Sequence, residues 1–350
     1  MEHAQFVYDY GILPEEVSPS RILTNLTELI WGDEIVRTLR LCGRREREIG
    51  AAASDFEKWN TLCQSLPLLQ GHWLPQYLSF VLKACFAIDT PATPEYAHAL
   101  WRQTAEQLQA APRTLWQALQ AQGLGNEVHL RCNIARWQSL PREACPVWDL
   151  NELTKTSAPS WEAWKYSMEE QGRTFLQAGG RLLSLCLPAT YRFSSPNPHL
   201  VGTILAKQER SNEDTSILLT QAIRGALVAL NGVVPLLHLR ISGNAEEAVK
   251  LLSYLNIQVG LPSLAWSCAE DPLPMLRLAS EKSFPTMLTA LSAEDLLARA
   301  LWERSLRALT SITPRGRLQL FTAAEIRQIP FARAELGRAL ASLEGYSNGE

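Results

Sequence analysis

Short apolar, strand-like runs alternate with segments of helical periodicity along most of the chain. Helix starts are marked by caps: Thr93-Pro94-Glu95 puts a proline at the first helical position, and Asn244 with Glu247 has capping-box spacing. A strand, a helix and a strand in that order predict a parallel sheet covered by helices. The predicted strands are residues 5–10, 127–132, 145–150, 181–187, 233–241, 261–268 and 284–291.

Residues 13–123 interrupt this alternation, because they contain no strand-like run. Helical segments follow one another there and are separated by breakers such as Gly43, Pro67 and Gly71. We therefore expect a helical insertion after the first strand, packed over one end of the sheet. A further helix is expected at residues 323–343, at the end of the fold.

The composition excludes several classes of protein. A chain of 350 residues that is 46% hydrophobic can bury a large core, so intrinsic disorder is excluded. The 33 Lys and Arg residues against 36 Asp and Glu residues leave no basic excess, so nucleic acid is not an expected partner. The most apolar stretch, residues 216–241, is interrupted by Arg224, Asn231 and Pro235, so no membrane association is expected.

Seven cysteines are scattered along the chain and none forms a C-x-x-C pair. This pattern argues against a disulfide framework and against a structural zinc site, and it fits a reducing compartment. The start, Met1-Glu2-His3-Ala4-Gln5, lacks the basic and apolar regions of a secretory leader. We therefore expect a cytoplasmic protein.

The first predicted strand leads into Tyr8-Asp9-Tyr10-Gly11 and then Pro14. Barrel hydrolases and isomerases that use a metal often end this strand in His-x-His, because alternate strand residues point to the same side. The segment resembles the first strand of the uronate (glucuronate) isomerase family, in the amidohydrolase superfamily, which reads like Tyr-His-Cys-His-Leu-Ser-Pro. Tyr8 and Pro14 match, whereas the two metal-binding histidines fall on Asp9 and Gly11.

The resemblance continues in order along most of the chain. Arg37 and Arg40 lie in a segment that looks like the family's Trp-Arg-x-x-Arg-x-x-Gly. Leu237-His238-Leu239 followed by Gly243-Asn244 is similar to Leu-His-Ile-Gly-Ala-x-Arg-Asn. Residues 284–289 resemble the Met-Leu-Thr-Asp-Ser-Arg of the family's last strand.

This resemblance implies a (β/α)8, TIM-barrel-like α/β fold. We expect one barrel domain over residues 1–350 with the helical insertion at residues 13–123 inside it. The barrel is expected to be incomplete or distorted, because a strand that the family would have between Cys268 and Phe284 is missing. The family reaction is the aldose–ketose isomerisation of D-glucuronate and D-galacturonate, with zinc or another divalent metal.

The family's metal-binding and catalytic residues are not matched in this sequence. The last strand's metal-binding aspartate falls on Ala290 and the following arginine on Ser292. The family's Asp-His pair falls on Leu185 and Cys186, and the arginine of its Trp-Arg-Pro-Asp segment falls on Asp149, beside the retained Trp148. A divalent ion needs three or four ligands, and only Asp9 and His238 remain, so we expect no metal and no other cofactor.

Three hypotheses follow. The first is a barrel without the isomerase reaction that binds a hexuronate, another sugar acid or a protein partner, with a second copy of the chain also open as a partner. The second is an active sugar-acid enzyme with a rebuilt site, and the third is a structural interaction module. The expected substrate-binding residues are Tyr8, Arg37, Arg40, Trp148 and His238, and the vestigial catalytic positions are Asp9, Gly11, Cys186, His238, Ala290 and Ser292.

These residues also have plainer interpretations. His238 in an apolar strand is typical of a buried core histidine, and Arg37 and Arg40 are spaced like arginines on a solvated helix face. Cys186 fits a small buried hydrophobe, and Asp9 fits a structural hydrogen-bond acceptor. Tryptophans such as Trp148 serve core packing more often than sugar stacking.

Overall fold

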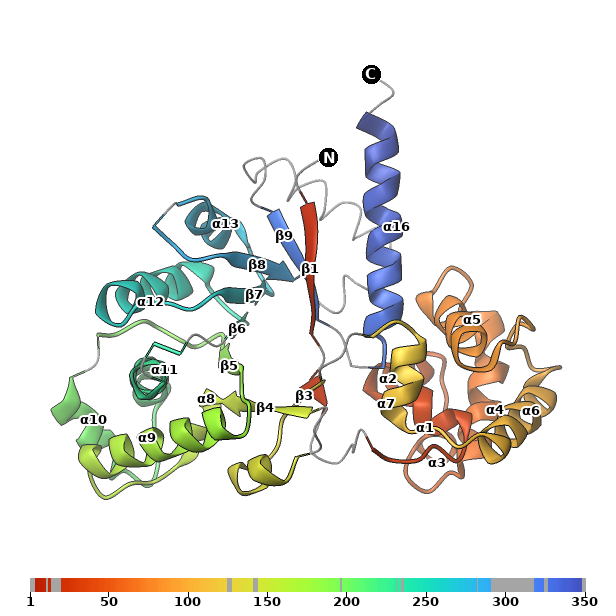
Figure 1. Cartoon of the computed structure of the whole chain (residues 1–350), viewed down its shortest axis with the longest axis horizontal. Coiled ribbons are helices and arrows are strands. Elements are labelled where there is room, and N and C mark those ends of the chain that lie inside the picture. The colour runs from red at the N-terminus through yellow and green to blue at the C-terminus, as the bar shows by residue number, and fades with distance from the viewer. Residues whose placement is uncertain are drawn as a thin grey trace.

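The computed structural model describes residues 4–10, 12–13, 20–124, 128–140, 144–195, 197–230, 232–233, 236–281, 283–290, 318–323 and 327–347. A parallel sheet lies between two groups of helices, α1 to α7 on one side and α8 to α13 on the other, and the long α16 begins at the first group and runs alongside β1 (Figure 1). In this part of the chain, no helix is both long and apolar enough to cross a membrane.

The described strands form one sheet in the order β1-β9-β8-β7-β6-β5-β4-β3-β2, and every pairing is parallel. The first and last members of this order are consecutive in the chain, because β1 ends at Tyr10 and β2 begins at Ile12. The hydrogen-bonded order therefore returns to its starting point, which is the topology of a closed barrel. The strands are β1 (Ala4–Tyr10), β2 (Ile12–Leu13), β3 (Val128–Leu130), β4 (Ala144–Asp149), β5 (Leu182–Leu187), β6 (Leu236–Ile241), β7 (Leu264–Cys268), β8 (Met287–Ala290) and β9 (Leu318–Ala323).

The predicted α/β barrel fold is confirmed, with two strands that were not predicted, the two-residue β2 and β9. Between Cys268 and Phe284 the described residues form α13 (Leu273–Ser280) and no strand, as expected. However, β9 follows β8 in the chain and pairs with both β8 and β1. Residues 284–291 are therefore not the last strand, and β9 completes the circuit of pairings.

The helical insertion has its own hydrophobic core. Its helices begin at well-formed caps, such as Ser54, whose side chain and Glu57 make a reciprocal capping box, and Thr114 with Gln117. Trp59 is fully buried in this core, and its indole Nε1 donates to the carbonyl of Ala97 at 2.8 Å. The helices are α1 (Leu26–Ile30), α2 (Asp33–Leu41), α3 (Glu46–Ile49), α4 (Asp55–Ser65), α5 (Trp73–Phe86), α6 (Ala97–Ala110) and α7 (Leu115–Ala121).

The start of α16 (Ile329–Ser347) joins the insertion to the end of the chain. Ile329 and Phe331 are buried in the same core as the insertion helices. The hydroxyl of Tyr77 donates to the carbonyl of Arg327 at 3.2 Å, and the guanidinium of Arg327 donates to the carbonyl of Trp31. The predicted closing helix at 323–343 is therefore present but begins later, and its first turn belongs to the insertion core.

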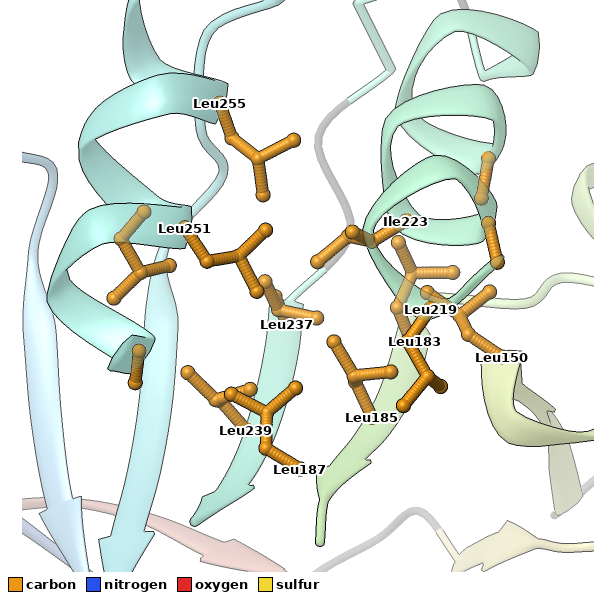
Figure 2. Close-up of a cluster of buried hydrophobic side chains, with 14 of the residues drawn as sticks. Leu150, Leu183, Leu185, Leu187, Leu219, Ile223, Leu237, Leu239, Leu251 and Leu255 are labelled. Carbon is orange, nitrogen blue, oxygen red and sulfur yellow. The ribbon is translucent and has the colours of Figure 1, made fainter. Parts of the chain in front are cut away.

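The other helices cover the outer face of the sheet. Leucines at alternate positions of β5 and β6 point toward α11 and α12 and are fully buried there (Figure 2). Because successive strand residues point to opposite faces, the residues between these leucines belong to the inner face of the barrel. The covering helices are α8 (Leu150–Lys155), α9 (Trp161–Gln177), α10 (Pro198–Leu205), α11 (Asn212–Ala229), α12 (Ala245–Gln258) and α13.

A close backbone approach holds the loop after β6 against the loop after β5. A Cβ atom added at Gly243 would lie 2.7 Å from the Cα of Ala189, whereas one added at Gly337 in α16 would meet nothing within 4 Å. We predict that Gly243→Ala lowers the free energy of unfolding by about 1–3 kcal/mol, because backbone would have to move. Gly337→Ala, the matched control, should raise it by up to about 1 kcal/mol through helix propensity. Urea denaturation measures both, and equal stability of the two variants would contradict the described packing.

Candidate functional site

A layer of polar side chains lies on the inner face of the barrel, near the carboxyl ends of the strands. Ser184 and Cys186 of β5 pair in register with His238 and Arg240 of β6. Arg240 is also in register with Ser267 of β7. The carboxyl end of a parallel barrel is where the active sites of this architecture are built, because side chains from successive strands converge there.

An ion pair links this layer to the neighbouring strands. Arg131 directly follows β3, and its Nε lies 3.1 Å from Oδ2 of Asp149 at the end of β4. The same guanidinium lies 3.4 Å from Oγ of Ser184 through Nη2, as a long hydrogen bond. The other carboxylate oxygen of Asp149 accepts from the backbone N–H of Asn151 at 3.0 Å and so caps α8. Asp149 therefore serves both the inner layer and the start of the next helix.

The side chain of Asn151 holds the end of β5. Its Nδ2 donates to the carbonyl of Cys186, and its Oδ1 accepts from the N–H of Cys186, each at 2.8 Å. The backbone pairing of β4 with β5 ends at Asp149 and Ser184, so this amide continues the ladder where α8 has already begun. The thiol of Cys186 lies 3.7 Å from Oγ of Ser242, in the loop after β6. Cys186 is thus firmly positioned at the rim of the barrel.

Two histidines of the described barrel are held in the neutral form. Burial lowers the pKa of His238 to about 3, and the charges of Arg240 and Arg131 add to the effect. Burial also lowers the pKa of His129, on β3, to about 4, with a contribution from Arg181. A neutral imidazole offers one donor and one acceptor, so His238 is suited to hydrogen bonding with hydroxyl groups rather than to carrying charge.

The charges of this layer do not suit a divalent cation. Arg131 and Arg240 act on His238, and Asp149 is already paired with Arg131. Among the described residues, no group of three or more His, Cys, Asp or Glu side chains could hold a metal ion. A zinc site needs three or four such ligands and would be repelled by two guanidinium groups. The donor set of the described residues therefore does not fit the metal that the resemblance implies.

The two arginines expected to bind substrate lie on the insertion. Arg37 and Arg40 belong to α2, and each forms an ion pair with a nearby glutamate, Glu34 and Glu46 respectively. Their side chains are 64% and 53% exposed. No described interaction joins either of them to the barrel strands, so their role in binding stays a prediction.

Trp148 does not reach the inner face. It is buried on the outer side of β4, where its ring centroid lies 5.7 Å from that of Phe175 and 6.2 Å from that of Trp137. The predicted stacking of this residue on a sugar ring is therefore wrong. The physical reason is the twofold period of the strand, which places Asp149 inward and its neighbour Trp148 outward.

For the remaining predicted site residues, the structure gives the strand and its pairing but no side-chain contact. Tyr8 and Asp9 lie in β1 and pair with Phe321 and Thr322 of β9, and Ala290 ends β8 and pairs with Phe321. Gly11 and Ser292 lie outside the described residues.

Sequence reasoning missed Arg131, Arg240 and Ser267 of the inner layer, Asn151, which holds the end of β5, and the buried His129 on β3. A signal for part of this set is present in the strands themselves. Ser184 and Cys186, and likewise His238 and Arg240, are the non-leucine residues at alternate positions of two leucine-rich runs. Such alternation predicts one apolar face and one polar face.

Comparison with known proteins gives a consistent result. The family model described as glucuronate isomerase matches residues 4–126. The uronate isomerase of Shouchella clausii is 32% identical over 111 residues, which is 31% of this chain and 23% of that protein. The uronate isomerase of Mannheimia succiniciproducens is 25% identical over 185 residues, which is 49% of this chain and 39% of that protein. The matched segments thus span well under half of the length of these relatives.

The structural likeness extends over almost the whole chain. The crystal structure of uronate isomerase from Thermotoga maritima superposes with a TM-score of 0.76 and 13% identity, covering 94% of this chain and 86% of that one. Glucuronate isomerase from Caulobacter crescentus gives a TM-score of 0.68, also with 13% identity, over 91% of this chain and 80% of that one. At this identity the likeness shows the fold.

The buried histidines predict an acid-dependent loss of stability. An unfolded histidine takes up a proton near pH 6.5, whereas His238 and His129 stay neutral in the native state, so the unfolded state binds more protons as the pH falls below about 7. The free energy of unfolding should therefore fall between about pH 7 and pH 5, by up to about 1.4 kcal/mol per pH unit for each histidine.

Urea unfolding of the wild type, His238→Asn and His199→Asn at several pH values measures this dependence. His238→Asn should show a shallower slope of stability against pH than the wild type, whatever its absolute stability. His199 is an exposed residue of α10, so its variant is the matched control and should keep the wild-type slope. An unchanged slope in His238→Asn would show that this side chain is not buried as described.

Proposed function

We propose that this chain is a divergent member of the glucuronate isomerase family, which it resembles over residues 4–126 and in its fold, and that it is a sugar-acid-binding barrel without the family's metal-dependent isomerisation. The observation that supports this most is the inner layer near the carboxyl ends of the strands. Among the side chains described there, two arginines and a neutral histidine stand with one carboxylate, that of Asp149, and the described residues do not form a metal site. The layer favours an anion over a cation.

The ligand class follows from the types of group in the layer. A hexuronate has one carboxylate and several hydroxyls. Guanidinium groups bind carboxylates through charge-assisted hydrogen bonds, and neutral imidazole and serine groups exchange hydrogen bonds with hydroxyls. Arg240 supplies the first kind of partner, and His238, Ser184 and Ser267 supply the second from the same or neighbouring strands. This combination supports a sugar acid as the ligand.

The proposed loss of turnover rests on the chemistry that isomerisation needs. Moving a carbonyl between adjacent carbons requires polarisation of the carbonyl oxygen and transfer of protons. A metal ion contributes several kcal/mol to the first requirement, and no described group replaces it. His238, with its pKa lowered to about 3, is a weak base for the second. We therefore expect the family reaction to be absent or residual.

The proposal includes a reducing, cytoplasmic setting. All seven cysteines are free thiols, and Cys63 and Cys85 are buried, where burial raises the pKa of each thiol. Free cysteines in such number are typical of reducing compartments. Hexuronate metabolism in that setting would bring the ligand to the protein.

A protein-interaction role is a second candidate, and one observation favours it. Large apolar side chains of the insertion are exposed, among them Leu41 at 90% and Leu68 at 67%. Exposed apolar groups are found at protein interfaces as well as singly on ordinary surfaces. The partner would then be another protein or a second copy of this chain, and sugar acids would have no effect on stability.

Two measurements on protein purified without chelator test the main proposal. Elemental analysis should find less than stoichiometric divalent metal, and D-glucuronate and D-galacturonate should not be isomerised. The melting temperature should rise with either hexuronate, because a ligand at about 100 times its Kd adds about 2.7 kcal/mol to the free energy of unfolding. D-Glucose and D-galactose, which lack the carboxylate, are the matched controls and should give smaller shifts.

The outcomes separate the three hypotheses. Stoichiometric metal with turnover would overturn the proposal in favour of an active enzyme. A shift with hexuronates but not with the neutral sugars would support it. If none of the four sugars changes the melting temperature, the interaction module is the hypothesis that remains.

A further inference from the structure

Arg240 occupies an unusual place for a charged residue. It lies within β6 on the inner face of the barrel, in register with Cys186 and Ser267, and it is solvent-exposed near the carboxyl end of the strand. Its strand neighbours Leu239 and Ile241 are buried on the outer face. A charged side chain at this place can therefore meet a ligand that enters the mouth of the barrel.

The charge of Arg240 is not balanced within the described protein. Arg131 is paired with Asp149, and Arg173 on α9 is paired with Glu170. No ion pair among the described residues includes Arg240, and both of its register neighbours are uncharged. Its field nevertheless reaches inward, since it contributes to lowering the pKa of His238. The guanidinium is therefore close to the buried layer and open to solvent on its other side.

Arg240 also departs from the family motif that this segment resembles. Counting from His238 to Asn244 along the family's Leu-His-Ile-Gly-Ala-x-Arg-Asn, Arg240 stands where the motif has glycine, and Gly243 stands where the motif has arginine. The close approach of Gly243 to Ala189 leaves no room for a side chain at that place. In this chain the positive charge lies inside the strand, three residues before the place of the motif's arginine.

We propose that Arg240 is the residue that binds the carboxylate of the ligand, at the mouth of the barrel. This rests on the proposed sugar-acid function and specifies how the ligand is oriented. The carboxylate lies against the guanidinium of Arg240 between Cys186 and Ser267, and the hydroxylated carbons extend inward toward Ser184 and His238. Arg131 takes no ligand charge, because Asp149 already neutralises it.

Calorimetric titration with D-glucuronate tests the assignment. Arg240→Gln should weaken binding about ten- to hundredfold, as expected for loss of a charge-assisted hydrogen-bonded pair. Arg240→Lys keeps the charge but loses the planar guanidinium group, so its affinity should lie between those of the wild type and Arg240→Gln. Arg173→Gln, an exposed arginine outside the barrel interior, is the matched control and should bind like the wild type. Thermal unfolding of each variant without ligand verifies that it is folded.

A ligand lacking the charge gives the second half of the test. The wild type should prefer D-glucuronate over its amide, D-glucuronamide, and Arg240→Gln should lose this preference. If Arg240→Gln binds D-glucuronate as the wild type does, the assignment is overturned while sugar-acid binding stands. If the wild type binds no hexuronate, the proposed function fails. Titration with inorganic phosphate then decides whether Arg240 binds anions at all. If phosphate binds to the wild type and to Arg173→Gln but not to Arg240→Gln, Arg240 is still an anion-binding residue. If the wild type does not bind phosphate, the assignment of Arg240 as an anion-binding residue is overturned as well.

Discussion

The parallel pairing of β5 with β6 is the interaction on which both the core and the site depend. Its register fixes which residues of the two strands face outward, and the outward set is the leucines that α11 and α12 bury (Figure 2). Slipping this register by one residue would move the leucines into the barrel and the polar residues under the helices. Hydrophobic burial on the outer face therefore holds Ser184, Cys186, His238 and Arg240 on the inner face. The site needs no separate scaffold.

The family resemblance is distributed unevenly along the chain. The matched residues 4–126 include the helical insertion, whereas the strands that form the inner layer follow later in the chain. The fold nevertheless persists over 94% of the chain at 13% identity. Core positions accept many apolar side chains as long as the pattern and volume are kept, so a barrel fold can persist while the residues of its inner face change. The proposed change of function from turnover to binding needs no change of fold.

Much of the fold could be predicted from the sequence, because it depends on periodicity. Seven predicted strands correspond to strands of the sheet, and the insertion was recognised from the absence of strand-like runs. Two strands were missed: β2, which is only two residues long, and β9, because residues 284–291, which resemble the family's last strand, were taken as the end of the sheet. The site was harder to predict, since it depends on which strands are neighbours. Arg131 and Asp149 are 18 positions apart and meet only because β3 and β4 pair. Trp148 was assigned to the ligand because it is retained in a family motif, although the strand period places it outward.

The central claim is that the inner layer holds a sugar acid and no metal. A crystal structure of the protein grown with both D-glucuronate and zinc, with anomalous scattering recorded at the zinc edge, tests this most directly. The account predicts a hexuronate near the carboxyl ends of β5, β6 and β7, with its carboxylate in contact with Arg240, and no anomalous peak in the barrel. A zinc ion bound between β1 and His238, with the sugar coordinated to it, would contradict the account.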